Sequence, residues 1–246
     1  MRRIIKWAMV GLLWVAAAGM AAAEPLSVGC DTDFKPFSYK SESGEITGFD
    51  IELWDALAKE LGLTYRLVPM KFTELLPALT AKKIDVALAG ITIRSEREKI
   101  VDFSFPYFES GLQVAVRAAD DHIGNIGDLV DKIVATKEGT TSADFLKNIQ
   151  TKSVKLFPSI ELAYAALKKK EVDAVVFDLQ NTLTYIAANA KGSIKTVGPT
   201  YRRQFYGVAF QQGSPLTEPF NIALLQYMED GWYDIVFRKW FGYVPQ

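Results

Sequence analysis

The sequence predicts an α/β protein of two lobes, each a mainly parallel sheet flanked by helices. Strand and helix patterns alternate through the first hundred residues, which is typical of a mainly parallel sheet. The same alternation returns after residue 130. Two extended segments, 107–111 and 202–206, separate the alternating parts, so the chain would cross twice between the lobes. Two crossings by hinge strands predict a hinged pair of lobes with a cleft between them.

The first 23 residues have the features of a secretory signal peptide. Basic residues at 2, 3 and 6 precede an apolar run from 7 to 20, and the alanines at 21–23 place a cleavage site before Glu24. The run is short and wrongly flanked for a membrane span, and no later stretch is long and apolar enough to be one. We therefore expect export to the periplasm.

Charge and cysteine content narrow the class of protein. The chain has a net charge of −1, and loss of residues 1–23, with three basic residues and no acid, leaves 223 residues and a charge of −4. This balance argues against nucleic acid as a partner. Cys30 is the single cysteine, so no disulfide can form within the chain. We expect Cys30 to be a strand residue and keep lipid anchoring as the minor alternative, because Leu26 lies one position too far from it.

The predicted first lobe is discontinuous and covers 24–106 and 207–246. Its strands are expected at 26–30, 64–68 and 84–89, with a last strand near 207–210. Asp50 is expected to cap a helix that ends at Gly62, and Thr73 one that runs to about residue 82. Gly90 would let the chain leave the sheet. Helices are expected at about 217–228 and 232–240.

The predicted second lobe covers 112–201 and repeats this design. Strands are expected at 132–136, 154–157 and 172–177, with a helix starting near Ser142 and one at 160–170 capped by Ser159. The segments 78–86 and 166–174 resemble each other weakly. Each contains Ala-Leu, a lysine three residues later, and an apolar run interrupted by aspartate. This fits two lobes of the same βα design.

The stretch 84–97 is the centre of the predicted site. An apolar strand ends near Gly90, and Thr92 and Arg97 follow within a few residues. A guanidinium is a planar fork of donors that matches a carboxylate, and the end of a strand in an α/β sheet is where small ligands bind. The alternative interpretation is a strand end followed by a solvated charge run at 94–99.

Other polar and aromatic side chains also follow strand ends. Asp31 and Phe34 follow the first strand, Phe72 the second, and Lys137 and Asp178 follow strands of the second half. The two aspartates could be simple caps, and the two phenylalanines could be core residues. The chain has one histidine and no cysteine cluster, so we expect no metal site and no cofactor. Residues 139–141 lack the lysine of a P-loop, which argues against nucleotide binding.

Several short runs together resemble the periplasmic amino-acid-binding proteins of ABC importers, the solute-binding protein family 3, and are most similar to its glutamine-binding members. The runs are FDIEL at 49–53, AGIT at 89–92 with Arg97, VDFS at 101–104, KEGTT at 137–141, WY at 232–233 and KWFG at 239–242. Each run is weak alone, but their order over residues 24–246 is highly specific. The resemblance implies the type II periplasmic-binding-protein fold, in which two lobes close on a ligand, and a monomer that works with a membrane permease.

The resemblance also implies a ligand pocket. Arg97 would bind the α-carboxylate with the Thr92 amide and the region of Thr141, and Asp178 would accept the α-ammonium with the Gly90 carbonyl and the Thr92 hydroxyl. Phe34 and Phe72 would hold the ligand's stem, and Asp31 and Lys137 would meet its side-chain amide. The expected ligand-binding residues are Asp31, Phe34, Phe72, Ala89, Gly90, Thr92, Arg97, Lys137, Thr140, Thr141 and Asp178.

Two departures from the glutamine binders bear on ligand choice. Phe177 stands where glutamine binders can carry histidine, and Thr141 stands where they can carry glycine. The expected ligand is glutamine, whose amide would donate to Asp31 and accept from Lys137. If Asp31 and Lys137 instead pair with each other, arginine or another polar amino acid becomes an alternative.

The leading interpretation is therefore a non-enzymatic transport protein. A periplasmic enzyme of the same fold, such as a cyclohexadienyl dehydratase, is the alternative from another class. It would need a general acid, and the sequence offers no spare carboxylate except Asp31. A receptor sensor domain would need a membrane span after the domain, and none is expected before Gln246.

Overall fold

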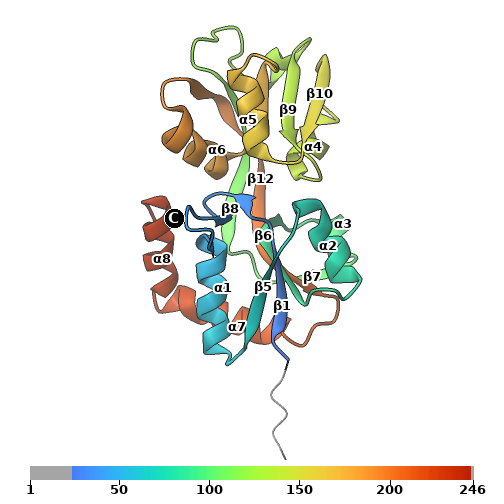
Figure 1. Cartoon of the computed structure of the whole chain (residues 1–246), viewed down its shortest axis with the longest axis vertical. Helices are drawn as coiled ribbons and strands as arrows, with labels where there is room; N and C mark the ends of the chain where they lie inside the picture. Colours follow the sequence, from blue (N-terminus) through green and yellow to red (C-terminus); the bar gives the residue numbers. More distant parts are fainter. Residues whose placement is uncertain (1–23, 245–246) are drawn as a thin grey trace, which may run out of the picture.

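The computed structural model describes residues 24–244 and has two lobes stacked along the long axis (Figure 1). The predicted signal peptide at 1–23 lies outside the described residues. The mixed α/β, two-lobed architecture agrees with the sequence prediction. Within residues 24–244, none of the helices has the length and apolar character needed to cross a bilayer.

The sheet of lobe 1 has a parallel centre. Strands β5 (Tyr65–Pro69), β1 (Leu26–Cys30) and β6 (Val86–Thr92) lie in that order and are parallel. Strand β12 (Ile194–Gln211) pairs antiparallel with β6, and β7 (Val101–Phe103) pairs antiparallel with β12. Cys30 ends β1 and is buried, in agreement with its prediction as a strand residue.

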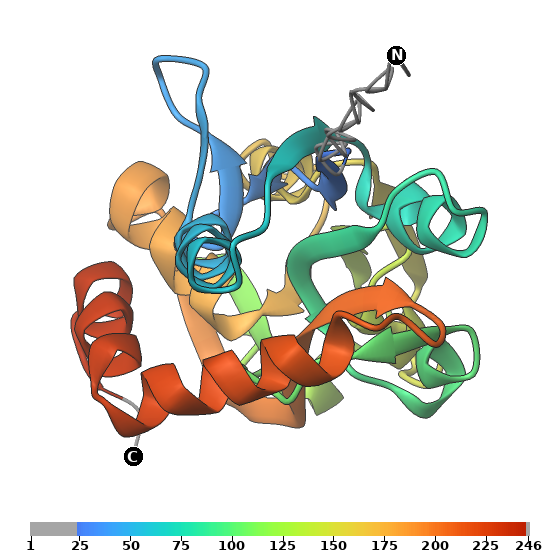
Figure 2. The same ribbon diagram turned by 90° about the horizontal axis from the view of Figure 1, so that it is seen from below.

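Helices cover both faces of this sheet because the side chains of its strands alternate between the faces. On β6, Val86 and Leu88 join the core beneath α1 (Phe49–Glu60), α7 (Thr217–Glu229) and α8 (Trp232–Phe241). Ala87, Ala89 and Ile91 face the other core, beneath α2 (Phe72–Thr80). Figure 2 shows α1, in light blue, and α2, in blue-green, on opposite sides of the strands.

Lobe 2 has the same layers. Strands β10 (Ser153–Phe157), β9 (Ile133–Lys137) and β11 (Ala174–Asp178) are parallel, and β8 (Phe108–Arg117) pairs antiparallel with β11. Helix α5 (Ile160–Lys168) packs on one face, and α4 (Thr141–Leu146) lies on the other, where Leu146 belongs to the same buried cluster as Val134 and Val176. Ser159 caps α5 by accepting from the Glu161 amide, as predicted.

Two long strands, β8 and β12, connect the lobes and pair with each other along their length (Figure 1). They join both sheets into one hydrogen-bonded series, β10-β9-β11-β8-β12-β6-β1-β5. The segment 202–206 and the strand predicted at 207–210 are parts of the same 18-residue strand, β12. The proposed hinge segment 107–111 covers the start of β8, and the bending of either segment stays a prediction.

The remaining elements are short. A small antiparallel sheet forms after β1, and the other elements are short helical segments. They are β2 (Asp33–Phe34), β3 (Ser38–Lys40), β4 (Ile46–Thr47), α3 (Ser95–Glu98), the 3-10 turn Ile126–Leu129, α6 (Leu179–Tyr185) and the π-helical turn Ile186–Ala190.

Three local predictions are wrong. Helix α1 begins at Phe49 with Gly48 as N-cap, so Asp50 lies in the first turn instead of capping it. Helix α2 begins at Phe72 with Lys71 as N-cap, so Thr73 is inside the helix. Strand β6 does not end at Gly90 but continues to Thr92, because an irregularity in its pairing with β12 accommodates the glycine.

The weak sequence repeat corresponds to equivalent structure in the two lobes. Asp85, before β6, accepts from the Ser27 amide of the neighbouring strand at 2.8 Å. Asp173, before β11, accepts from the Ile133 amide at 2.8 Å in the same way. The lysine two residues after each preceding helix, Lys82 or Lys170, has positive φ. Each aspartate therefore holds two parallel strands in register at their amino ends.

Candidate ligand-binding site

A cavity between the lobes brings together every residue that the sequence predicted for the site. Its volume is about 20 Å³. The residues that line it are Asp31, Phe34, Phe72, Ala89, Gly90, Thr92, Arg97, Lys137, Thr140, Thr141, Phe177 and Asp178. They come from the carboxyl ends of β1, β6, β9 and β11 and from the segments that follow these strands and β5, because parallel strands open toward the same edge of their sheet. Phe177 is the lining residue that the predicted set lacks.

Arg97 lies on the short helix α3 at the lobe 1 side of the cavity. Its Nη1 donates to the Thr92 carbonyl at 3.0 Å, and its Nη2 donates to the Gly139 carbonyl of lobe 2 at 3.5 Å. The guanidinium lies 5.6 Å from the centre of the Phe72 ring. Burial lowers the pKa of Arg97 to about 10, so the group stays cationic at neutral pH. A half-buried cation held by carbonyls is suited to binding a carboxylate.

Asp178 ends β11 and faces the cavity from lobe 2. It is 7 % exposed, and its Oδ1 atom has no hydrogen-bond partner among the described residues. Burial raises the pKa of Asp178 to about 7, while Tyr206, Arg97 and Lys137 lower it. A buried carboxylate with an unpaired oxygen is suited to accepting a bond from a cation, which would also offset its desolvation.

Aromatic rings form the apolar walls. Phe34 packs edge-on against Phe177 with ring centres 5.9 Å apart and stacks on Phe37 at 5.0 Å. Phe34 therefore belongs to the core and to the cavity wall at once. Phe72 instead begins α2 and lies near two cations, because the Lys137 ammonium is 5.9 Å and the Arg97 guanidinium 5.6 Å from its ring centre.

Lys137 and Asp31 form an ion pair across the cleft. Their side chains are 3 % and 7 % exposed, and the Lys137 ammonium contacts the Asp31 carboxylate. The same ammonium lies 3.4 Å from the Asp33 carbonyl and 3.9 Å from the Asp33 carboxylate. Burial raises the pKa of Asp33. Two carboxylates thus share one ammonium at this end of the cavity.

Three threonines line the cavity, and Gln204 orders two of them. Gln204, on β12, is 7 % exposed, and its Oε1 accepts from the Thr92 hydroxyl at 3.1 Å and the Thr141 hydroxyl at 3.0 Å. It therefore joins a residue of each lobe. Thr140 is the N-cap of α4 and donates to the Lys137 carbonyl at 2.7 Å. Sequence analysis missed Gln204, and its polar position on an extended segment was the available signal.

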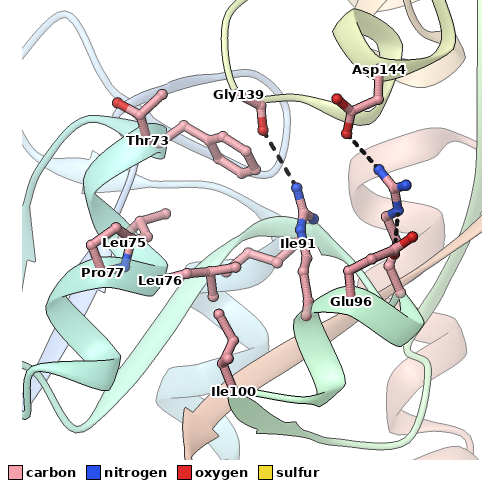
Figure 3. Close-up of a pocket in the computed structure, with 12 residues that line it drawn as sticks. Thr73, Leu75, Leu76, Pro77, Ile91, Glu96, Ile100, Gly139 and Asp144 are labelled. Atoms are coloured by element: carbon pink, nitrogen blue, oxygen red, sulfur yellow. Dashed lines mark hydrogen bonds and ion pairs between the residues drawn. The ribbon is translucent and has the colours of Figure 1, made fainter.

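A larger cavity of about 560 Å³ adjoins the first and shares Phe72 and Arg97 with it. Figure 3 shows Gly139 and Asp144 of lobe 2 on one side, and Leu75 and Leu76 of α2 on the other. The dashed lines to Gly139 and Asp144 are hydrogen bonds from Arg97 and Arg94. The Arg94 bond to Asp144 is 2.7 Å long, so it links the lobes at the edge of the cleft.

The charges of the groups around the cavity complement those of a small zwitterion. Arg97 and Asp178 supply opposite charges on opposite lobes, and phenylalanine rings line the same cavity. Among residues 24–244, no group of three or more histidine, cysteine, aspartate or glutamate side chains is placed to hold a metal ion.

Solved structures with this architecture are similar over nearly the whole described chain. An ancestral arginine-binding protein bound to arginine is 41 % identical, with a TM-score of 0.84 over 89 % of this chain and 98 % of that one. An ancestral arginine-binding protein bound to glutamine is also 41 % identical, with a TM-score of 0.82 over the same shares. The ancestral amino-acid-binding protein AncCDT-1, a precursor of cyclohexadienyl dehydratase, is 36 % identical, with a TM-score of 0.82 over 88 % and 95 %.

Sequence comparison gives the family. The L-cystine-binding protein TcyJ of Escherichia coli (strain K12) is 33 % identical over 220 residues, which cover 88 % of this chain and 82 % of TcyJ. The family model of the bacterial extracellular solute-binding proteins, family 3, matches residues 26–243. This chain therefore belongs to the bacterial extracellular solute-binding proteins of family 3.

Proposed function

We propose that this protein captures a polar L-α-amino acid by closing its two lobes and delivers it to the permease of an ABC importer outside the cytoplasm. The observation that carries the proposal is that Arg97 of lobe 1 and Asp178 of lobe 2, with opposite charges, line the same cavity. Arg97 binds the α-carboxylate, and Asp178 accepts the α-ammonium. A ligand held by both lobes stabilises the closed form by the difference in its affinity for the two forms.

Glutamine is the first candidate ligand. Asp31 and Lys137 line the cavity and pair with each other, so the ligand's side chain would have to enter between this acceptor and this donor. A primary amide satisfies both, since its NH₂ donates to Asp31 and its oxygen accepts from Lys137. A glutamate side chain would instead place a second negative charge beside Asp31, and a desolvated contact between like charges costs several kcal/mol.

Arginine is the second candidate, and Asp33 is the observation that favours it. Lys137 neutralises one of the two carboxylates near it, so Asp31, Asp33 and Lys137 together carry an excess negative charge. A guanidinium at the ligand's end would offset this charge. The ancestral arginine-binding proteins bound to arginine and to glutamine support keeping both amino acids as candidates.

A binding role is favoured over an enzymatic one. A dehydratase of this fold needs a general acid beside the leaving hydroxyl. Of the two acids that line the cavity, Asp31 is engaged by Lys137, and Asp178 is assigned to the ligand's ammonium. The likeness to a precursor of cyclohexadienyl dehydratase makes this alternative worth testing. Incubation with a cyclohexadienyl substrate such as prephenate or arogenate, followed by ultraviolet absorbance of the aromatic product, would reveal it.

Isothermal titration calorimetry against the common L-amino acids and L-cystine tests the proposal. We expect tight one-to-one binding of glutamine or arginine by the wild-type protein, and binding by Arg97→Ala that is weaker by roughly 30-fold or more. The matched control is Arg94→Ala, which removes the neighbouring arginine that does not line the inner cavity. Wild-type protein that binds no amino acid would overturn the proposed function.

A further inference from the structure

The backbone of Gly90 at the cavity wall is held by a carboxylate outside the cavity. Strand β6 pairs regularly with β12 at Ile91 and Thr92 and at Val86 and Ala87, but the register shifts between them. Gly90 lies in this interval with φ of +53°, a left-handed conformation that favours glycine. Its amide donates to Asp50 Oδ2 at 2.7 Å. The side chain of Asp50 thus replaces a bond of the sheet ladder.

Asp50 is buried, and the bond from the Gly90 amide is the hydrogen bond that its carboxylate accepts from another element. Asp50 is 1 % exposed, in the first turn of α1, where a helix amino end favours a negative charge. Its second oxygen, Oδ1, has no hydrogen-bond partner among residues 24–244, and the same is true of the Tyr107 hydroxyl. Burial raises the pKa of Asp50 to about 7, whereas the Gly90 amide and the neighbouring Tyr107 hydroxyl lower it. The ring of Phe49, the residue before Asp50, lies 6.1 Å from the Tyr107 ring between centres, so the two unpaired groups lie in the same buried region.

Tyr107 connects this region to both crossing strands. It precedes β8, and its amide donates to the Tyr206 carbonyl of β12 at 2.9 Å. Its own carbonyl accepts from the Tyr233 hydroxyl of α8. A change in the angle between the lobes would start in these strands, so it would move the Tyr107 hydroxyl relative to Asp50.

We propose that Asp50 is a positioning residue that fixes the Gly90 peptide for ligand binding and, through Tyr107, couples that peptide to the crossing strands. The proposal rests on the proposed function, because Gly90 would accept from the ligand's ammonium. Asp50 does not line the cavity, so it acts through Gly90. The shape of the wall depends on this peptide, since the Phe34 ring lies where a side chain of residue 90 would begin.

Four variants separate this role from simple support of the fold. Asp50→Leu removes the acceptor of the Gly90 amide, Asp50→Asn keeps one, and Tyr107→Phe removes the hydroxyl that faces the carboxylate. Asp55→Asn, an exposed acid on the same helix, is the matched control. The readouts are amide hydrogen exchange of Gly90 by NMR without ligand, and affinity for L-glutamine and L-arginine by calorimetry.

We expect Asp50→Leu to accelerate exchange at Gly90 by about tenfold or more, while Leu88 on the same strand keeps its protection, and to weaken binding by a similar factor. Asp50→Asn should keep Gly90 protected and retain most of the affinity. Tyr107→Phe should keep Gly90 protected but weaken binding several-fold, because only the coupling is lost. Asp55→Asn should match the wild type in both readouts.

Two results for folded Asp50→Leu would overturn the proposal. One is a Gly90 amide that stays protected from exchange. The other is a Gly90 amide that loses protection while the affinity for ligand stays at the wild-type value. If Asp50→Leu does not fold, an unprotected Gly90 in Asp50→Asn or wild-type affinity in Tyr107→Phe would overturn it. Failure of the proposed function is distinguishable, because the wild-type protein would then bind neither amino acid, whereas the Gly90 exchange is measured without ligand.

Discussion

Lys137 of lobe 2 forms a buried ion pair with Asp31 of lobe 1, and the pair is part of the wall of the cavity between the lobes. Breaking a buried pair by removing one partner leaves an uncompensated charge, which costs about 3–5 kcal/mol. The pair therefore links the stability of the closed form to the choice of ligand. A ligand side chain must either satisfy both groups or replace one of them.

The first prediction concerns Lys137→Leu. The variant should bind glutamine more weakly, because the amide oxygen loses its donor, and it should gain affinity for arginine, whose cation can replace the lost ammonium beside Asp31 and Asp33. Calorimetry with both amino acids measures the change. Lys147→Leu is the control, since that lysine is 75 % exposed and pairs with Asp144 outside the inner cavity. Unchanged glutamine affinity with no gain for arginine would contradict a ligand contact by Lys137.

The second prediction concerns Arg97→Ala. Loss of the guanidinium leaves the ligand carboxylate buried without its charged partner, a change of about 2–5 kcal/mol, so binding should weaken by roughly 30-fold to several thousand-fold. The fold should be retained because Arg97 is only half-buried and lies on a four-residue helix. Circular dichroism checks the fold, and calorimetry measures the affinity. Wild-type affinity in the folded variant would exclude Arg97 as the group that binds the ligand's carboxylate.

The sequence was sufficient to predict the fold class, and its resemblance to a known family implied the residues around the cavity except Phe177. Parallel strands open toward one edge, so side chains that follow strand ends, such as Asp31 and Asp178, converge without any knowledge of distances. Gln204 was not predicted as a site residue because it follows no strand end and belongs to no motif. Its partners Thr92 and Thr141 are distant in sequence, and only the pairing of β12 brings them together.

Asp50 shows a different limit of sequence interpretation. An aspartate before an amphipathic run is typical of an N-cap, yet the cap position belongs to Gly48, and the carboxylate binds Gly90, forty residues later. Local patterns do not specify such a contact, because it depends on how α1 packs against β6. The pairing of β8 with β12 was likewise not predictable, since strand alternation does not reveal which distant strand is the partner.

The third prediction concerns closure of the lobes. The Arg94–Asp144 bond joins the lobes, but its side chains are 28 % and 44 % exposed, and such pairs contribute about 0.2–1 kcal/mol. Asp144→Asn should therefore weaken ligand binding by no more than about fivefold. Glu96→Gln is the matched control, because it removes a partner of Arg94 within lobe 1 and should leave the affinity unchanged.

Small-angle scattering completes this test of closure. The radius of gyration of the wild-type protein should fall on saturation with ligand, and Asp144→Asn should reach the same value at higher ligand concentration. A radius that does not change under saturating ligand would argue against bending at 107–111 and 202–206.

The last prediction is that ligand binding releases a proton from Asp178 below neutral pH. Burial raises the pKa of Asp178 to about 7, so at pH 6 about nine tenths of the free protein carries the protonated acid. The ligand's ammonium favours the carboxylate and lowers that pKa, so a proton must leave on binding. At pH 8 the carboxylate is already ionised, and no proton is released. Affinity should therefore fall by up to about tenfold per pH unit below 7.

The raised pKa of Asp178 also determines whether the protein becomes more or less stable as the pH rises. The folded-state pKa of Asp178 lies above its value in the unfolded chain, so its contribution is fully present below about pH 4 and is lost as the pH rises through about 7. Calorimetry at pH 6 in buffers of different ionisation enthalpy measures the released proton. Asp50 has a pKa of about the same value but does not line the cavity, so Asp50→Asn should still release the proton while Asp178→Asn should not. Equal release by both variants would assign the proton to another group and remove Asp178 from the ammonium site.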